Sequence, residues 1–202
     1  MMILRATPAS PFGRKVKLAA SVLGLSDRIR VEPADTNDPA DTLRQQNPLG
    51  KMPVLVLDDG STLYDSRVIV EYLDHCAGGG KIIPREASAR FAALRLQALA
   101  DGMTDAQILI IYEGRWRPPE HHARNWLDYQ HDKIRRGLAV LEADPPSFNG
   151  IPNVGHLALA CFLGHRDLRF PGTWRDTHPR LAAWLDRFAA QVPAFAETKA
   201  AA

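Results

Sequence analysis

Three short segments in the first third of the chain combine residue types that could bind a small thiol-containing molecule. The first is Ser10-Pro11-Phe12-Gly13-Arg14-Lys15-Val16. Ser10 is a natural N-cap and Pro11 fits the first helical position, so free backbone N–H groups and the positive end of a helix dipole would surround the Ser10 hydroxyl. Such a place stabilises an anion, and a hydroxyl donor there could lower the pKa of a bound thiol. The basic residues Arg14 and Lys15 follow one turn later, and the alternative interpretation is a plain helix cap.

The second segment is Asn47-Pro48-Leu49-Gly50-Lys51-Met52-Pro53-Val54, which places a proline directly before an apolar strand. The peptide bond before Pro53 can be cis, which would leave the N–H and C=O of Met52 free to pair with an extended peptide. Lys51 would supply a positive charge for a carboxylate. The alternative is a simple turn that enters a strand.

The third segment is Asp65-Ser66, after a short apolar strand. A helix is predicted to begin here, so the Ser66 N–H and hydroxyl could hold a carboxylate while Asp65 accepts from an ammonium group. These two partners describe the head of an α-amino acid, although Asp-Ser is also a good capping sequence. Taken together, the three segments match the needs of a small cysteine-containing peptide, and glutathione meets all of them.

The elements that must position these segments alternate between strands and helices over the first eighty residues. Apolar spacing predicts strands at 3–6 and 29–32, a hairpin of 54–57 with 62–64, and helices at 10–23 and 65–75. Gly24 falls where a helix C-terminal glycine belongs. A helix between the first two strands makes them parallel, which is a βαβ unit.

The pattern of apolar residues changes after Gly78-Gly79-Gly80. Beyond these glycines the spacing is helical throughout, with predicted helices at 90–115, 121–142, 154–164 and 179–190. We therefore expect residues 1–80 to form an α/β domain, 81–87 a linker and 88–202 an all-α domain. Residues 199–202 are expected to be a frayed tail.

The order of these segments and elements resembles a cytosolic-type glutathione transferase, specifically a bacterial serine-type member, over nearly the whole chain. The resemblance implies a thioredoxin-like N-terminal domain that binds glutathione, followed by a helical-bundle C-terminal domain that supplies the electrophile pocket. It also implies a homodimer. The activity it implies is conjugation of the glutathione thiolate to small apolar electrophiles, with reduction of hydroperoxides by the same thiolate as a further activity.

By position, the resemblance makes Ser10 the catalytic residue that hydrogen-bonds the glutathione sulfur. It makes Met52 and cis-Pro53 the pair whose backbone holds the cysteinyl unit, and it places Lys51 at the glycine end. Asp65 and Ser66 match the pair that binds the γ-glutamyl group, with aspartate in place of the commoner glutamate. Arg14 matches a basic position, for which we expect only an electrostatic role.

One motif departs from the family pattern. Where the family has a Ser or Thr helix cap with an aspartate three residues later, this chain has Asn153 and His156. Asn can cap a helix, but a histidine cannot act as a carboxylate, so we expect a weakened capping box and softer helix nucleation.

Composition excludes several other functions. The 25 basic and 23 acidic residues give a net charge of +2 with no block of one sign, which argues against nucleic acid as a partner. No apolar run is long enough to cross a membrane. His121, His122 and His131 lack the spacing of a ligand set, so no metal is expected.

The chain has only two cysteines, Cys76 and Cys161, far apart in the sequence. This pattern suits a reducing compartment, and we predict a cytoplasmic protein whose cysteines are packing residues. Any reactive sulfur would then arrive with the ligand.

Two questions stay open at this level. Met103, Gln107, Tyr112 and Trp116 lie on or just after a long helix, and each could line the electrophile pocket or belong to the core. The alternative function is a non-catalytic glutathione-binding or protein-interaction module with the same fold, and isomerase or lyase action would use the same site.

Overall fold

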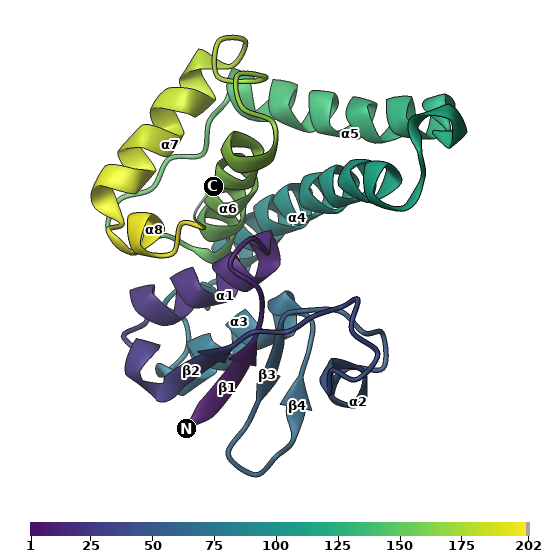
Figure 1. Cartoon of the computed structure of the whole chain (residues 1–202). Coiled ribbons are helices and arrows are strands. Elements are labelled where there is room, and N and C mark those ends of the chain that lie inside the picture. The colour runs from purple at the N-terminus through teal and green to yellow at the C-terminus, as the bar shows by residue number, and fades with distance from the viewer. Residues whose placement is uncertain (201–202) are drawn as a thin grey trace.

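The computed structural model describes residues 1–200, which form a sheet-containing half and a helical half (Figure 1). The sheet has four strands in the order β2-β1-β3-β4. They are β1 (Met2–Arg5), β2 (Ile29–Glu32), β3 (Val54–Val56) and β4 (Thr62–Leu63). β1 is parallel to β2 and antiparallel to β3, and β3 is antiparallel to β4. The thioredoxin-like first half, with its βαβ unit and hairpin, is therefore confirmed.

Helices pack on both sides of this sheet. α1 (Pro11–Val22) and α3 (Ser66–Cys76) share the main core with Leu55, whereas the neighbouring Val54 packs against α2 (Leu43–Gln46) in a small separate cluster. Neighbouring residues of a strand point to opposite faces, so one strand serves both clusters. The sequence did not predict α2, because one turn of helix is too short to show a period. A 3₁₀ turn, Ser26–Arg28, leads into β2.

The sheet topology brings the three candidate segments to one end of the sheet. β1 and β4 run in the same direction and β3 runs against them. The end of β1, the start of β3 and the end of β4 therefore lie at the same side. Ser10 follows the first of these points, Met52-Pro53 precedes the second and Asp65-Ser66 follows the third.

The helical half contains five α-helices within the described residues, in agreement with the predicted all-α bundle. They are α4 (Ala87–Trp116), α5 (Arg124–Ala143), α6 (Val154–Arg169), α7 (Pro179–Gln191) and α8 (Ala194–Glu197), with a 3₁₀ turn at Pro119–His121. α4 and α5 form a long pair that extends to one side, and α6 lies centrally between α4 and α7 (Figure 1). None of the helices in residues 1–200 is long and apolar enough to cross a membrane.

α6 is longer than predicted and its N-terminus is better capped. The apolar run ends near Gly164, but the helix continues to Arg169, and Asp167 in this extension accepts hydrogen bonds from Trp174 and Arg175. At the start, the Asn153 side chain accepts from the N–H groups of Gly155 and His156.

The expectation of a weakened capping box is wrong. Nδ1 of His156 accepts from the Asn153 N–H at 3.1 Å, which completes the reciprocal pair of a capping box. A neutral imidazole nitrogen carries a lone pair and can take the acceptor role of a carboxylate. Burial supports this neutral state, because it lowers the pKa of His156 to about 4.

The glycine-rich stretch between the halves is firmly held. The Asp74 carboxylate accepts from the N–H groups of Gly80, Lys81 and Ile82 at 2.7, 2.9 and 2.8 Å. The Ile82 carbonyl then accepts from the N–H of Val154 at the start of α6. This segment therefore joins the end of α3 to the beginning of α6 through hydrogen bonds.

Candidate active site

Ser10 caps the first helix and lies beside a cavity. Its Oγ accepts a hydrogen bond from the Gly13 N–H at 3.0 Å, as expected of an N-cap. This bond uses an oxygen lone pair, so the hydroxyl proton remains available to an anion. A side chain at Gly13 would place a Cβ 2.8 Å from the Ala6 Cβ and 3.3 Å from the Ser10 Oγ, so glycine lets the helix start close to the end of β1.

Met52 and Pro53 are joined by a cis peptide bond, as the family resemblance implies. The Met52 sulfur accepts from the Thr7 N–H at 3.3 Å, which links this segment to the loop that precedes Ser10. Within residues 1–200, the backbone N–H and C=O of Met52 form no hydrogen bond. They are therefore free to pair with an extended ligand, and the adjacent Lys51 side chain is exposed.

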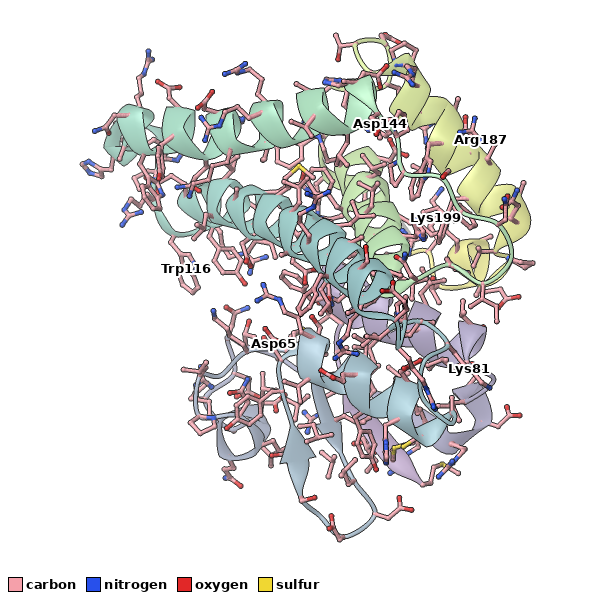
Figure 2. The ribbon with its side chains drawn as sticks, turned by 180° about the vertical axis from the view of Figure 1, so that it is seen from behind. Asp65, Lys81, Trp116, Asp144, Arg187 and Lys199 are labelled. Atoms are coloured by element: carbon pink, nitrogen blue, oxygen red, sulfur yellow. The ribbon has the colours of Figure 1, made fainter. Side chains whose placement is uncertain are left out.

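Asp65 and Ser66 form the N-terminus of α3. The Asp65 carboxylate accepts from the Arg67 N–H at 2.9 Å, so the capping interpretation of this pair is correct. Asp65 is exposed at the junction of the two halves, below α4 (Figure 2), and its second carboxylate oxygen is available to a ligand. Ser66 is the first helical residue and is buried. The peptide bond between Tyr64 and Asp65 is also cis.

The two basic residues after Ser10 have a different role from the one expected. Lys15 is 1 % exposed and its Nζ binds both carboxylate oxygens of Asp101 on α4 at 2.8 Å. Arg14 donates to the Phe195 carbonyl at 2.5 Å and lies over the Phe195 ring at 4.0 Å. Both side chains thus hold the two halves together. Arg14 therefore has a structural role in addition to the electrostatic role that was expected.

Asp101 also connects the two helix N-termini. Its Oδ2 accepts from Nε of Arg67 at 3.1 Å, next to Ser66. Lys15 on α1 and Arg67 on α3 therefore share one buried carboxylate from α4. The sequence carries no local signal for this arrangement, because Asp101 is one of several polar residues on this part of α4, with Thr104 and Asp105 close by.

The cavity beside Ser10 lies between the start of α1 and the helical half. Its walls come from the loop and first turn of α1 and from α6 with the C-terminal segment: Pro8, Ala9, Ser10, Pro11, Arg14, Gly164, His165, Leu168, Lys199 and Ala200. No local sequence pattern marks the residues of the second group as part of a site. Lys199 and Ala200 line the cavity, while the rest of the predicted frayed tail, 201–202, lies outside the described residues.

The other predicted site residues lie away from this cavity. Met52, Pro53, Asp65 and Ser66 are not part of its wall and follow the end of the sheet instead. Ser10 is the one candidate that belongs to both places. A ligand laid along the sheet end could therefore place a reactive atom at Ser10, and the cavity of about 20 Å³ beside it has room for one group the size of a water molecule.

Four residues of α4 were considered for this cavity. Met103 and Gln107 are buried, whereas Tyr112 and Trp116 are exposed toward the far end of the helix, where Figure 2 shows Trp116. None of the four contributes to the cavity wall in the described part of the chain.

The cysteines offer no nucleophile at this site. Cys161 is buried, which raises the pKa of its thiol to about 11, and Cys76 is the half-buried last residue of α3. A thiol with so high a pKa is unreactive at neutral pH. Residues 1–200 contain no group of three or more His, Cys, Asp or Glu side chains that could hold a metal ion.

Comparison with known proteins agrees with this architecture. Residues 9–76 match the model of the glutathione S-transferase N-terminal domain, and residues 97–187 match that of the C-terminal domain. The chain is 31 % identical over 183 residues to Escherichia coli YibF, described as an uncharacterized GST-like protein, with 88 % of each chain covered.

Two crystal structures extend the comparison over the full length of both chains. A glutathione transferase family member from Pseudomonas fluorescens Pf-5 with bound glutathione is 43 % identical, with a TM-score of 0.91. A glutathione S-transferase from Methylobacillus flagellatus with glutathione bound is 36 % identical, with a TM-score of 0.89. Since sequence, domain order and fold agree along the whole chain, the protein belongs to the glutathione S-transferase family.

Proposed function

We propose that the protein is a glutathione transferase in which Ser10 stabilises the thiolate of glutathione for attack on a small apolar electrophile. The observation that carries the proposal is the Ser10 hydroxyl at the N-terminus of α1, beside a cavity, with its proton free to donate. The helix dipole and this donor both favour the charged form of a sulfur placed there. The buried Cys161 leaves the attacking sulfur to the ligand.

Glutathione would lie along the end of the sheet. The free backbone N–H and C=O of Met52, before cis-Pro53, would pair with the cysteinyl unit as an added strand does. Ser66 would hold the γ-glutamyl carboxylate with its N–H and hydroxyl, and Asp65 would accept from the ammonium group. Lys51 would meet the glycine carboxylate. The bound glutathione in the two similar crystal structures supports this choice of ligand.

In the reaction, the thiolate forms a bond to an electrophilic carbon and the leaving group departs with its electron pair. The thiol proton goes to solvent when the thiolate forms. We assign glutathione binding to residues 1–80 and the electrophile to the helical residues 88–202 beside the cavity, with 81–87 as the linker. Because both distant cysteines are free, we propose the reducing cytoplasm as the location.

A homodimer is part of the proposal. On α3 and α4, Val68 and Phe91 are 46 % and 69 % exposed. Arg90 and Glu71 pair across these helices at 2.9 Å, so the two helices lie side by side. We propose that a second copy covers Val68 and Phe91, because this contact would remove both apolar side chains from water.

The test is conjugation of 1-chloro-2,4-dinitrobenzene to glutathione by the wild type and by Ser10→Ala. We expect kcat/KM to fall about 10- to 100-fold in the variant, the value of one hydrogen bond to a charged group. Without the hydroxyl the thiol pKa rises, so the activity profile should also move to higher pH. Rate measurements across pH 5.5 to 9 report both effects.

Ser88→Ala is the matched control, because Ser88 is exposed in the first turn of α4, away from the cavity. Equal rates for the wild type and Ser10→Ala would remove Ser10 from the mechanism. Retention on immobilised glutathione separates the alternative function. A protein that is retained without conjugating would be a glutathione-binding module, and one that is neither retained nor thermally stabilised by glutathione would be an interaction module.

A further inference from the structure

A buried chain of three polar side chains ends at the cavity beside Ser10. Arg166 on α6 donates from Nη1 to Oε1 of Gln107 on α4 at 3.1 Å. The Gln107 Nε2 lies 2.6 Å from Nδ1 of His165. Gln107 is fully buried, and Arg166 and His165 are 8 % and 6 % exposed. His165 is also part of the cavity wall.

The direction of each hydrogen bond in this chain follows from its first member. A guanidinium can only donate, so the oxygen of the Gln107 amide must face Arg166. The amide NH₂ group then faces His165 and must donate, which leaves Nδ1 of His165 as the acceptor. In a neutral imidazole with an accepting Nδ1, the proton is on Nε2.

The same geometry keeps the ring neutral. A protonated His165 would direct a second N–H at the Gln107 NH₂ group, and the two donors would oppose each other. Burial lowers the pKa of His165 to about 4, and the nearby cations Arg169, Arg14 and Arg166 act in the same direction. The ring is therefore an uncharged donor across the physiological pH range.

The second ring nitrogen has no partner in the described part of the chain. Within residues 1–200, Nε2 of His165 forms no hydrogen bond, and it is not among the buried polar atoms that lack one. Since the ring lines the cavity, whose volume is about 20 Å³, this N–H is available to a group the size of a water molecule or a carbonyl oxygen that enters it. We propose that His165, with its proton held on Nε2 by Arg166 and Gln107, donates a hydrogen bond to an oxygen of the bound electrophile.

This proposal rests on the proposed function and specifies its substrate class as electrophiles whose oxygen gains negative charge, such as conjugated carbonyl compounds. In such an addition the thiolate forms the S–C bond at the β-carbon. The π electrons shift through the α-carbon toward the carbonyl oxygen, where the Nε2–H stabilises the developing charge. The enolate then takes a proton from solvent at the α-carbon. Alkyl halides have no such oxygen and gain nothing from the donor.

The tautomer can be tested directly by ¹⁵N NMR of the imidazole nitrogens in the full-length protein at pH 7, with His165→Gln used to assign the signals. We expect His165 to show a protonated Nε2 and an unprotonated Nδ1. Gln107→Glu replaces the donor with a carboxylate that accepts from Nδ1–H, and this variant should place a proton on Nδ1. A wild-type ring protonated on Nδ1, or on both nitrogens, would overturn the proposal.

The donor role can be tested with two electrophiles, 2-cyclohexenone and benzyl chloride. The measured quantity is the ratio of kcat/KM for the enone to kcat/KM for the halide. His165→Asn keeps an amide oxygen that Gln107 can reach but has no donor at the Nε2 position. We expect this ratio to fall about tenfold in His165→Asn and in Gln107→Glu. His165→Gln restores a donor at the Nε2 position and should recover most of the ratio.

The exposed His75→Asn is the matched control and should leave the ratio unchanged. A wild type that conjugates benzyl chloride but not the enone, or a ratio unaffected by His165→Asn, would overturn the donor role and leave the proposed function intact. A wild type that conjugates neither compound, nor 1-chloro-2,4-dinitrobenzene, would overturn the proposed function and the donor role with it.

Discussion

Helix α6 carries two buried histidines whose surroundings differ. His156 lies in the first turn, where Nδ1 accepts from the Asn153 N–H and the ring packs 5.1 Å from the Phe148 ring. His165 lies near the other end, where Nδ1 accepts from Gln107 and the ring lines a cavity. Burial lowers the pKa of each to about 4.

The two histidines show that the charge state of a buried ring does not reveal its function. Both rings are neutral for the same reason, which is the cost of charging an imidazole away from water. The two rings are equally buried, at 6 % exposed each, and the His156 ring packs against the rings of Phe148 and Trp184. His165 keeps an N–H that faces no protein partner in residues 1–200. A lowered pKa thus identifies a buried ring, and only its remaining contacts show whether it can meet a ligand.

The largest expected effect is a loss of folding stability at low pH, which follows from the lowered pKa that the two histidines share. Each has a folded-state pKa of about 4, below the ordinary value of 6.5, so the unfolded chain binds protons more readily. The resulting stability is present above about pH 6.5 and is lost as the pH falls to about 4. Each ring should contribute about 3 kcal/mol to this loss.

Urea unfolding at pH 7 and pH 4 measures this effect. His156→Gln and His165→Gln should each reduce the pH dependence of the unfolding free energy by that share, while His75→Gln, at an exposed position, serves as control. Variants with the pH dependence of the wild type would show that the two rings are not buried as neutral groups.

The next effect concerns the glycines that directly precede the two histidines. A Cβ at Gly155 would lie 2.7 Å from the Ala93 carbonyl oxygen and 2.7 Å from the Leu96 Cβ, both on α4. Backbone cannot yield as a side chain can, so Gly155→Ala should lower the unfolding free energy by about 2 kcal/mol. Gly102→Ala is the control, since a Cβ there meets nothing within 4 Å, and it should be neutral or stabilising. A Gly155→Ala protein as stable as Gly102→Ala would contradict the close packing of α4 and α6.

The smallest effect is expected at Gly164, beside the cavity. A Cβ at this position would lie 2.5 Å from Nη1 of Arg14 and 3.0 Å from Cζ of Phe195. The Arg14 side chain can shift, at the loss of its bond to the Phe195 carbonyl, so Gly164→Ala should cost about 1 kcal/mol in urea unfolding. A loss as large as that of Gly155→Ala would show that both ends of α6 are equally rigid, and the contrast between them would fail.

Much of the fold could be predicted from local patterns. The strands, the hairpin and the long helices follow from apolar periodicity, and the cap at Ser10 follows from residue preferences that act within one turn. The short α2 and α8 were missed because four residues carry no period. The capping box at Asn153 was misjudged because the acceptor role was assigned to carboxylates, although a neutral histidine can also fill it.

The candidate site also has a part that local motifs predict and a part that depends on contacts between distant residues. Ser10, Met52-Pro53 and Asp65-Ser66 were found because each motif is contiguous and has its own local chemistry, and the strand directions then bring them to one end of the sheet. Lys15 and Asp101 were not connected beforehand, because their ion pair joins positions far apart in the chain.

By itself, the sequence determined the order of elements, the two-part architecture and the segments able to bind a thiol peptide, since these depend on interactions between near neighbours. Only the tertiary structure decided that Arg14 and Lys15 hold the halves together and that His165 reaches the cavity beside Ser10. The proton position on His165 depends on Arg166 and on Gln107 from another helix, and such long-range contacts exist only once α4 and α6 have packed.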